Sequence, residues 1–436
     1  MREDGVEGKR AGVGGAVGAR MRLSTVSEVR PRPLTYAAEW PGFVVAALVF
    51  TLTAGALTGA LDLWTLRVAQ SPVPLDHHRA HGVAQLFGFL GLFTMGVSLH
   101  LAPRLFGVAP PERGLIRLLK WSAVGGVFLV VVGRLGALVP GSTWLGLVGA
   151  GLVVVAQTTW ASMLWTFWRD LRGPHETMHR FLLAGVGWWW VAAVTLLGWQ
   201  VGQTFGGVAT AVQLESVWAP AAFGGVASWV WGIFFRAGIC TLHVRRPSEK
   251  AQQRLWLAWQ GAVALAVLAT WVQVAWLDAV VSVALVAAVG LVWWTVRPFS
   301  GEGLAEEEGL QARSVQAGLV FLGVFAALQG WSALGEVGVW TPVLIRDASR
   351  HAYTLGGMTL LLVGFAGRMV PGFRGTRLKW PRAYDAGVVA LGLGAAMRLG
   401  ELAGTKLTMA FAGASGGLAF GGLVLVAASL LGSLRR

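Results

Sequence analysis

The sequence is dominated by a succession of apolar segments, each long enough to cross a lipid bilayer as a helix. A helix needs about 20 apolar residues to span the hydrocarbon core. Mean hydropathy is +0.62 and only 13% of the residues are charged, which excludes an ordinary soluble domain. The sequence therefore predicts an all-α polytopic membrane protein with twelve spans, at approximately 42–66, 81–103, 114–139, 143–168, 179–206, 213–241, 252–277, 278–298, 313–334, 341–367, 383–403 and 408–433.

Two of these spans carry the same motif, and a third carries a weaker copy. Residues 81–103 and 351–371 each begin with histidine, contain two glycines eight residues apart and end in proline. With the weaker copy, the three glycine pairs are Gly88 with Gly96, Gly224 with Gly232, and Gly356 with Gly364. The second and third pairs follow the first by 136 and 268 residues. The repeat predicts one transmembrane domain, 39–436, built from three pseudo-threefold units of four helices, at about 39–172, 173–300 and 310–436.

The positive charges indicate the orientation of the chain rather than a nucleic-acid partner. The net charge is +14, but Lys and Arg are spread over short loops that alternate with poorly charged ones. With both termini in the cytoplasm, every basic loop lies on the cytoplasmic side. Residues 1–38 lack an apolar run and predict a disordered basic cytoplasmic arm, with Met21 as an alternative start. The single cysteine, Cys240, excludes a disulfide framework and a cysteine-based iron–sulfur or zinc site.

Two of the eight histidines are placed to bind one haem. His81 and His351 begin the second helix of units one and three, at similar depth near the outer surface. Pseudo-threefold packing would bring these helices around a shared interior, where two neutral imidazoles would hold a haem iron from both faces. This predicts a low-spin b-type haem with His81 and His351 as axial ligands. The alternative is that both are interfacial histidines with polar partners.

Residues near these two histidines are candidates for further contacts. Arg350 and Arg79 are predicted to bind haem propionates, because a guanidinium suits a carboxylate. Further arginines of the outer half are Arg67, Arg346, Arg134 and Arg398. His77 and His78 lie beside Asp76 in the loop before the second span and are candidate copper ligands. The alternative for this loop is simple solvation.

One further motif matches a zinc site. His175-Glu176-Thr177-Met178-His179 has the HExxH pattern, which on a helix places two histidines and a general base on one face. It predicts, as a remote alternative, an intramembrane zinc protease. The competing interpretation is a cytoplasmic turn that starts the fifth span after Pro174.

The second span resembles the second helix of haem–copper oxidase subunit I, through His81, Phe87-Gly88-Phe89, Gly96 and Pro103-Arg104. The tenth span is similar to that superfamily's tenth helix, with His351 at the second position of its His-x-His pair and Ser349 at the first. The resemblance implies the same twelve-helix fold, with His81 and His351 as ligands of the low-spin haem. The superfamily's copper ligands have no counterpart in span six or in 252–277, which excludes the usual copper–haem binuclear centre.

The chain also resembles, over nearly its whole length, the NnrS family of bacterial membrane proteins, which carry haem and copper and are linked to nitric oxide stress. Arg350-His351, Met358 and Arg368 match that family's late motif, and His78 with His81 matches the early one loosely. Val83-Ala84 stand where the family has a second histidine and a glutamate.

These observations predict a haem protein of the bacterial cytoplasmic membrane. A bis-histidine haem transfers single electrons, and the resemblance implies a role in the nitric oxide response or denitrification. The implied partners are nitric oxide and an electron donor, either a quinol or a cytochrome. Two alternatives stay open. A displaceable histidine would allow nitric oxide or oxygen reductase-like chemistry at the haem, and a triple-repeat bundle with intramembrane basic residues also suits a transporter.

Overall fold

The described part of the chain is helical throughout. The computed structural model describes residues 39–136, 141–207, 211–300, 309–336, 338–342 and 344–435, and these ranges contain helices and no strand. Twelve helices in these ranges are long and apolar enough to cross a membrane, which confirms the predicted all-α polytopic architecture. The predicted arm, 1–38, lies outside the described residues.

Each span is one helix or a stack of helical segments. The first four are α1 (Trp40–Phe50) with η2 (Thr51–Gly55) and α2 (Ala56–Arg67); α3 (Leu75–Val83) with η3 (Ala84–Gly91) and α4 (Leu92–Phe106); α5 (Arg113–Leu135); and α6 (Ser142–Asp170). The next four are α7 (Thr177–Thr204); α8 (Ala211–Ala219) with η4 (Pro220–Val226), α9 (Ala227–Ile233), η5 (Phe234–Gly238) and α10 (Ile239–Thr241); α11 (Glu249–Val272); and α12 (Ala275–Val296). The last four are α13 (Gly309–Glu336); α14 (Ile345–His351) with η7 (Ala352–Thr359) and α15 (Leu360–Arg374); α16 (Pro381–Arg398) with η8 (Leu399–Ala403); and α17 (Lys406–Leu434).

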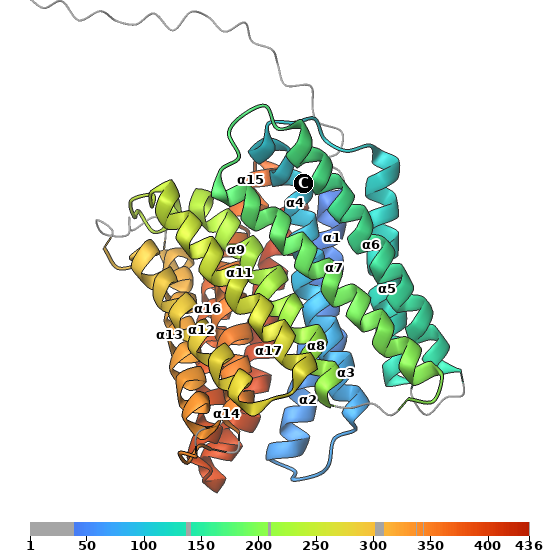
Figure 1. The fold of residues 1–436 in the computed structure, drawn as a ribbon, viewed down its shortest axis with the longest axis vertical. Coiled ribbons are helices and arrows are strands. Elements are labelled where there is room, and N and C mark those ends of the chain that lie inside the picture. The colour runs from blue at the N-terminus through green and yellow to red at the C-terminus, as the bar shows by residue number, and fades with distance from the viewer. Residues whose placement is uncertain are drawn as a thin grey trace, which may run out of the picture.

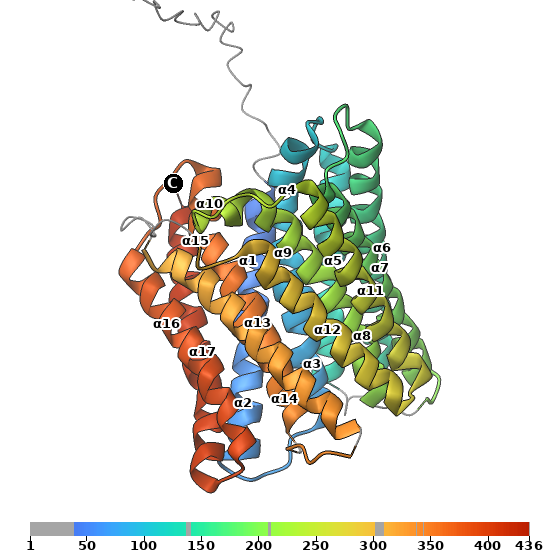
Figure 2. The ribbon, with the colours of Figure 1, turned by 60° about the vertical axis from the view of Figure 1, so that its left-hand side comes forward.

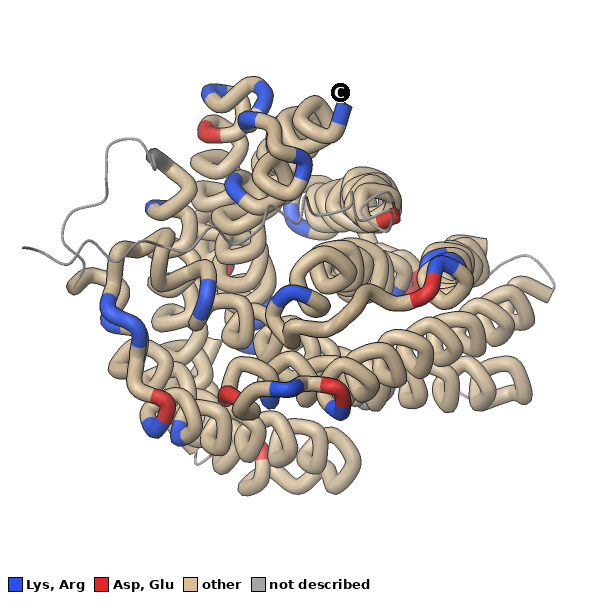
Figure 3. The backbone as a smooth tube through the Cα atoms, turned by 90° about the horizontal axis from the view of Figure 1, so that it is seen from above, with Lys and Arg blue, Asp and Glu red and all other residues tan. Residues whose placement is uncertain are grey.

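Successive spans run in opposite directions, so the connections divide between two ends of the bundle. The C-terminus and the turns that follow α4 and α15 lie at one end, whereas α2, α3 and α14 lie toward the other (Figures 1 and 2). Figure 3 looks onto the first of these ends and shows many Lys and Arg on its loops, with fewer Asp and Glu. We call this the basic end, and the end that carries α3 and α14 the histidine end.

Three of the twelve spans form the interior of the bundle. Of the most apolar stretch of each span, 89% is buried in Leu75–Phe106, 94% in Glu215–Thr241 and 78% in Ile345–Arg374. The corresponding share in the other nine described spans is 33–50%, as expected for helices that face lipid on one side. The buried spans are the three that carry the glycine repeat, so the repeat marks the helices at the centre.

The glycine repeat allows each central span to approach the span before it. A Cβ built at Gly96 would lie 2.9 Å from the Phe43 Cβ, and one built at Gly364 would lie 2.7 Å from a Val315 methyl group. The same close approach occurs at the remaining four positions, Gly88 against Phe50, Gly224 against Trp188, Gly232 against Leu182 and Gly356 against Phe321. Small residues at these contacts suit helix packing in lipid, where association depends on close van der Waals contact.

The first glycine of each pair lies in a π-helical segment. Gly88 lies in η3, Gly224 in η4 and Gly356 in η7. A π-helical turn widens the helix and releases carbonyl groups from the regular ladder, and such turns are frequent at functional sites. In η4 the Ala222 carbonyl accepts a hydrogen bond of 3.0 Å from the Tyr353 hydroxyl of η7, which ties two central spans together.

The close contact at Gly356 gives a stability prediction. Gly356→Ala would force its new methyl group into the Phe321 ring, so we expect the free energy of unfolding to fall by about 1–3 kcal/mol. The matched control is Gly290→Ala in α12, where a Cβ meets nothing within 4 Å, and we expect it to change stability by less than about 1 kcal/mol. Thermal unfolding of the two variants in one detergent checks this. Equal stability of the two variants would contradict it.

Candidate functional site

His81 is held by the first span through one ring nitrogen. Its Nδ1 lies 2.9 Å from the Gly55 carbonyl oxygen. Gly55 ends the π-helical η2 with φ −84° and ψ −104°, a non-helical conformation that turns this carbonyl out of the helix ladder. A Cβ built at Gly59 would overlap the His81 ring, so glycine at this position leaves the space that the ring fills. Nδ1 therefore donates its proton to Gly55, and Nε2 is the nitrogen with a free lone pair.

His351 has the same arrangement on the tenth span. Its Nδ1 lies 2.9 Å from the Asp347 carbonyl oxygen and 3.4 Å from the Asp347 carboxylate, one helical turn earlier. Within the described part of the chain, Nε2 of neither His351 nor His81 has a hydrogen-bond partner. In proteins, a histidine that ligates a metal almost always donates its other ring N–H to a carbonyl or carboxylate, which fixes the tautomer. Both side chains meet this condition.

The two histidines lie on spans that begin at the same end of the bundle. His81 lies on α3 beside His78, with 6.3 Å between the two ring centroids. His351 ends α14, which also lies at the histidine end (Figure 1). Two imidazoles from separate spans with free Nε2 atoms fit the axial ligation of one haem iron. The described residues contain no group of three or more His, Cys, Asp or Glu side chains able to hold a metal ion.

A buried charge network supports His351 from behind. The two terminal nitrogens of the Arg398 guanidinium are engaged, Nη2 by the Asp347 carboxylate and Nη1 by the Glu401 carboxylate. Arg67 of α2 also contacts Glu401, at 3.2 Å, so the network links spans ten, eleven and one. The side chains of Arg398 and Glu401 are 4% and 0% exposed. Asp347 and Glu401 were not predicted as site residues. The position of Asp347, four residues before His351 on a helix, was the available signal.

The predicted propionate ligands Arg350 and Arg79 lie in different surroundings. Arg350 pairs with Glu215 and lies over the Trp218 ring, with 5.8 Å between the guanidinium carbon and the ring centroid. Arg79 is two residues from His81 on α3, and such residues point to opposite sides of a helix. It pairs with Asp76 at 3.2 Å. Its role at a haem stays a prediction that its present contacts do not support.

The structure places the candidate copper ligands His77 and His78 in helix α3 rather than in the predicted loop, and it separates them. His77 Nδ1 lies 3.6 Å from Asp62 Oδ1 of α2, whereas His78 faces His81. Asp76, predicted as their neighbour, pairs instead with Arg79 and Arg134. Copper binding at His77 and His78 stays a prediction.

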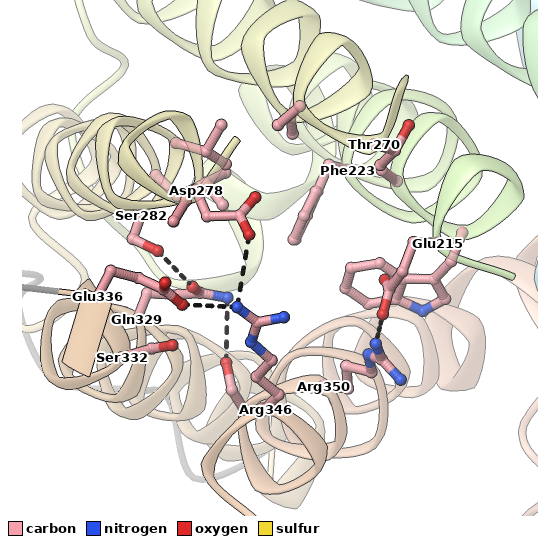
Figure 4. Close-up of a pocket in the computed structure, with 18 of the residues that line it drawn as sticks. Glu215, Phe223, Thr270, Asp278, Ser282, Gln329, Ser332, Glu336, Arg346 and Arg350 are labelled. Atoms are coloured by element: carbon pink, nitrogen blue, oxygen red, sulfur yellow. Dashed lines mark hydrogen bonds and ion pairs between the residues drawn. The ribbon is translucent and has the colours of Figure 1, made fainter. Parts of the chain in front are cut away.

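A cavity of about 450 Å³ lies between spans six to ten, and neither His81 nor His351 is among the described residues that line it. Arg346 lies between Asp278 and Glu336, at 3.4 and 2.7 Å, and Arg350 points toward Glu215 (Figure 4). A chain of hydrogen bonds crosses the deeper wall, from Ser282 to Gln329 at 3.1 Å and from Gln329 to Ser349 at 3.2 Å. Trp218 and Phe223 form an aromatic wall. The cavity thus has charges of both signs and an aromatic side.

The HExxH motif forms a helix start. Glu176 is the N-cap of α7, and its backbone N–H donates to His179 Nδ1 at 3.2 Å. His179 Nε2 lies 3.0 Å from the Leu105 carbonyl oxygen, so both ring nitrogens are engaged. The His175 ring stacks on Trp168 at 4.1 Å. This geometry leaves His179 no nitrogen for zinc and supports the competing interpretation, a turn that starts the span.

The Glu176 side chain gives a pH-dependence prediction. Partial burial acts to raise the pKa of its carboxyl, but the hydrogen bond from Arg246 and the charges of Arg236 and Arg246 outweigh it, so this pKa lies below its usual value. Stability from such a carboxylate is present above the unfolded-state pKa and is lost as the pH falls through the folded-state pKa. We therefore expect the wild type to lose more stability than Glu176→Gln between about pH 6 and pH 3. Thermal unfolding at several pH values measures this.

The control for this experiment is Asp170→Asn, at an exposed ion pair with Arg169, which should follow the wild type because exposed pairs contribute little. Parallel pH profiles for the wild type and Glu176→Gln would contradict the prediction.

His100 lies at the basic end, far from His81 along the same span. Its ring stacks on Phe373 at 3.9 Å, and Nε2 contacts the Arg104 guanidinium. It is therefore not part of the group formed by His81 and His351.

Comparison with known proteins gives no family assignment. No protein-family model matches the chain, and no curated protein sequence matches it.

Proposed function

We propose that this chain is a multi-pass protein of the bacterial cytoplasmic membrane that binds one low-spin b-type haem between His81 and His351. The proposal rests on the hydrogen bonding of the two histidine rings, which is the same in both. Each donates from Nδ1 to a backbone carbonyl at 2.9 Å, and each keeps Nε2 free, on two of the three buried central spans. Ionisable groups inside a membrane bundle are costly and mark functional sites.

The proposal includes a pseudo-threefold arrangement like that of haem–copper oxidase subunit I, with both termini in the cytoplasm. Three features support it: the central position of the three glycine-repeat spans, the π-helical segment at the first glycine of each, and the packing of each central span on the span before it. The concentration of basic loops at one end supports the orientation, because cytoplasmic loops carry the excess of Lys and Arg (Figure 3).

In this function His81 and His351 would hold the haem iron through their free Nε2 atoms. A bound haem supplies reversible one-electron oxidation and reduction. Gly55 and Asp347 fix the tautomers of His81 and His351, and the Asp347 carboxylate, 3.4 Å from His351 Nδ1, makes that imidazole the more basic ligand. A haem held by both histidines would transfer single electrons. We place this electron transfer in the nitric oxide response or denitrification, with a quinol or a cytochrome as donor.

Haem content tests this function. The protein purified in mild detergent should contain one b-type haem per chain, as measured by pyridine haemochrome absorbance against protein mass. A protein produced with ample haem supply that purifies without haem would overturn the proposal.

The cavity favours a second function, transport of a small polar solute. It lies between two central spans and carries Arg346, Arg350 and three carboxylates at the histidine end (Figure 4). Binding sites between the repeats of a bundle are typical of secondary transporters. Solute uptake into liposomes by a haem-free protein, abolished in Arg346→Gln, would support this function over the first. Uptake that Arg346→Gln leaves unchanged would exclude the cavity as the solute site.

A further inference from the structure

A second basic cluster lies on the side of α3 opposite His81, and no part of the proposed haem function uses it. Arg79 of α3 and Arg134 in the last turn of α5 bind the same oxygen of Asp76, at 3.2 and 3.5 Å. Trp199 of α7 packs against both guanidinium groups, with its ring centroid 5.3 Å from the guanidinium carbon of Arg79 and 4.6 Å from that of Arg134. We call these four residues the arginine cluster.

The arginine cluster carries one positive charge that its own acid does not neutralise. Two guanidinium groups stay protonated in proteins, and one carboxylate balances only one of them. The side chains of Arg79 and Arg134 are 5% and 8% exposed, so water does not screen the remaining charge. A buried charge without a partner is strongly destabilising, which indicates that a further anionic group belongs here.

The buried hydrogen-bonding groups of the cluster that lack a partner are all donors. Buried atoms without a partner in the described structure include Arg79 Nη2, Arg134 Nε and Nη2, and the indole nitrogen of Trp199. Each unpaired buried donor destabilises the fold by about 1–3 kcal/mol. Several donors with no matching acceptor call for a ligand that only accepts hydrogen bonds. A planar guanidinium presents paired N–H groups that suit the oxygens of a phosphate.

The position of the cluster defines how a ligand reaches it. Arg79 lies near the start of the second span, Arg134 near the end of the third and Trp199 near the end of the fifth, all at the histidine end of the bundle. The Asp76 side chain is 33% exposed, so a ligand can approach the cluster from the side of Asp76. Ends of spans lie at the depth of lipid headgroups. We propose that the arginine cluster binds a singly charged phosphate group, as in the phosphodiester of a phospholipid headgroup or in inorganic phosphate.

Binding should follow from ligand addition to full-length protein in a phosphate-free maltoside detergent. The probes are phosphatidylglycerol, inorganic phosphate and, as an uncharged control, diacylglycerol. We expect phosphatidylglycerol to raise the unfolding temperature of the wild type and its apparent affinity to fall about tenfold or more in Arg134→Gln and in Arg79→Gln. Arg169→Gln, an exposed arginine with a 68% exposed side chain, is the matched control and should keep the wild-type response.

The difference in unfolding temperature between the wild type and Arg134→Gln distinguishes a ligand site from a structural cluster, because this difference should change sign when lipid is added. Without lipid or phosphate, Arg134→Gln removes the unbalanced buried charge, so it should unfold at the same or a higher temperature than the wild type. With phosphatidylglycerol the order should reverse. Trp199→Phe keeps an aromatic ring at this position but removes the indole N–H together with the five-membered ring, so we expect a weaker response to phosphatidylglycerol than in the wild type.

The outcomes separate the sources of the phosphate. Stabilisation by phosphatidylglycerol alone assigns a lipid headgroup, and stabilisation by inorganic phosphate as well assigns a free anion. If neither probe stabilises the wild type, or if Arg79→Gln and Arg134→Gln respond as strongly as Arg169→Gln, the proposal is wrong. Haem content is measured on the same samples, so failure of this site and failure of the haem site are seen separately.

Discussion

Replacing His81 or His351 by alanine is expected to reduce the haem content of the purified protein to a small fraction of the wild-type value. Each variant removes one of the two proposed axial ligands, so the remaining histidine would hold the iron from one face only. His175→Ala is the matched control. His175 lies in the loop before α7, where its ring stacks on Trp168, and it has no contact with the site. Haem-to-protein ratios of the three variants, prepared side by side, measure the effect.

A further variant distinguishes the loss of an iron ligand from a general loss of the folded structure. Gly59→Ala places a methyl group in the space of the His81 ring without removing an imidazole. We expect about 10–100-fold weaker haem binding, the usual cost of disturbing the partners that orient a metal ligand. Full haem content in His81→Ala, with an intact fold, would contradict the assignment of the axial ligand.

Arg398→Ala is expected to give the largest loss of stability, about 3–5 kcal/mol in the free energy of unfolding. Arg398 is the shared partner of Asp347 and Glu401, and its loss leaves the buried Glu401 carboxylate close to the half-buried Asp347 carboxylate. The matched control is Arg346→Ala. Arg346 also bridges two carboxylates, but its side chain is 61% exposed, so we expect a loss below about 1 kcal/mol.

Denaturant unfolding in mixed micelles measures both variants. Because Asp347 also holds His351, Arg398→Ala should lose haem affinity together with stability. Similar stability losses in Arg398→Ala and Arg346→Ala would show that burial does not control the strength of these ion pairs.

The spans were predictable because each depends on a local property, the length of an apolar run. The predicted boundaries differ most from the structure at three places. The second span begins at Leu75 rather than at 81, the tenth ends at Arg374 rather than at 367, and the sequence predicts a break between the seventh and eighth spans after residue 277. The structure places it earlier, because Gln273 adopts a left-handed conformation with φ 54° and ends α11. An apolar run continues through this turn, so composition does not reveal it.

The glycine repeat predicted which helices are special, since small residues permit close approach. It did not predict the π-helical segments, because the register of backbone hydrogen bonds leaves no trace in residue type at these positions. Gly55 shows the consequence. Its carbonyl becomes the partner of His81 only because η2 interrupts the regular helix.

The partners of the charged residues were the least predictable part of the site. The four residues of this network come from spans one, ten and eleven, and their pairing depends on how the spans pack: Arg67, Asp347, Arg398 and Glu401. Arg79 was predicted at the haem from its nearness to His81 in sequence. A helix turns about 100° per residue, so two positions along it place Arg79 on the other side, with Arg134 and Trp199.

The absorption spectrum of the dithionite-reduced protein, recorded before and after addition of carbon monoxide, tests the central claim most directly. With His81 and His351 on both faces of the iron, the account predicts sharp low-spin bands that carbon monoxide leaves unchanged. A shift of the bands would show an open or readily displaced axial position and would contradict bis-histidine ligation, and a spectrum without haem bands would contradict haem binding itself.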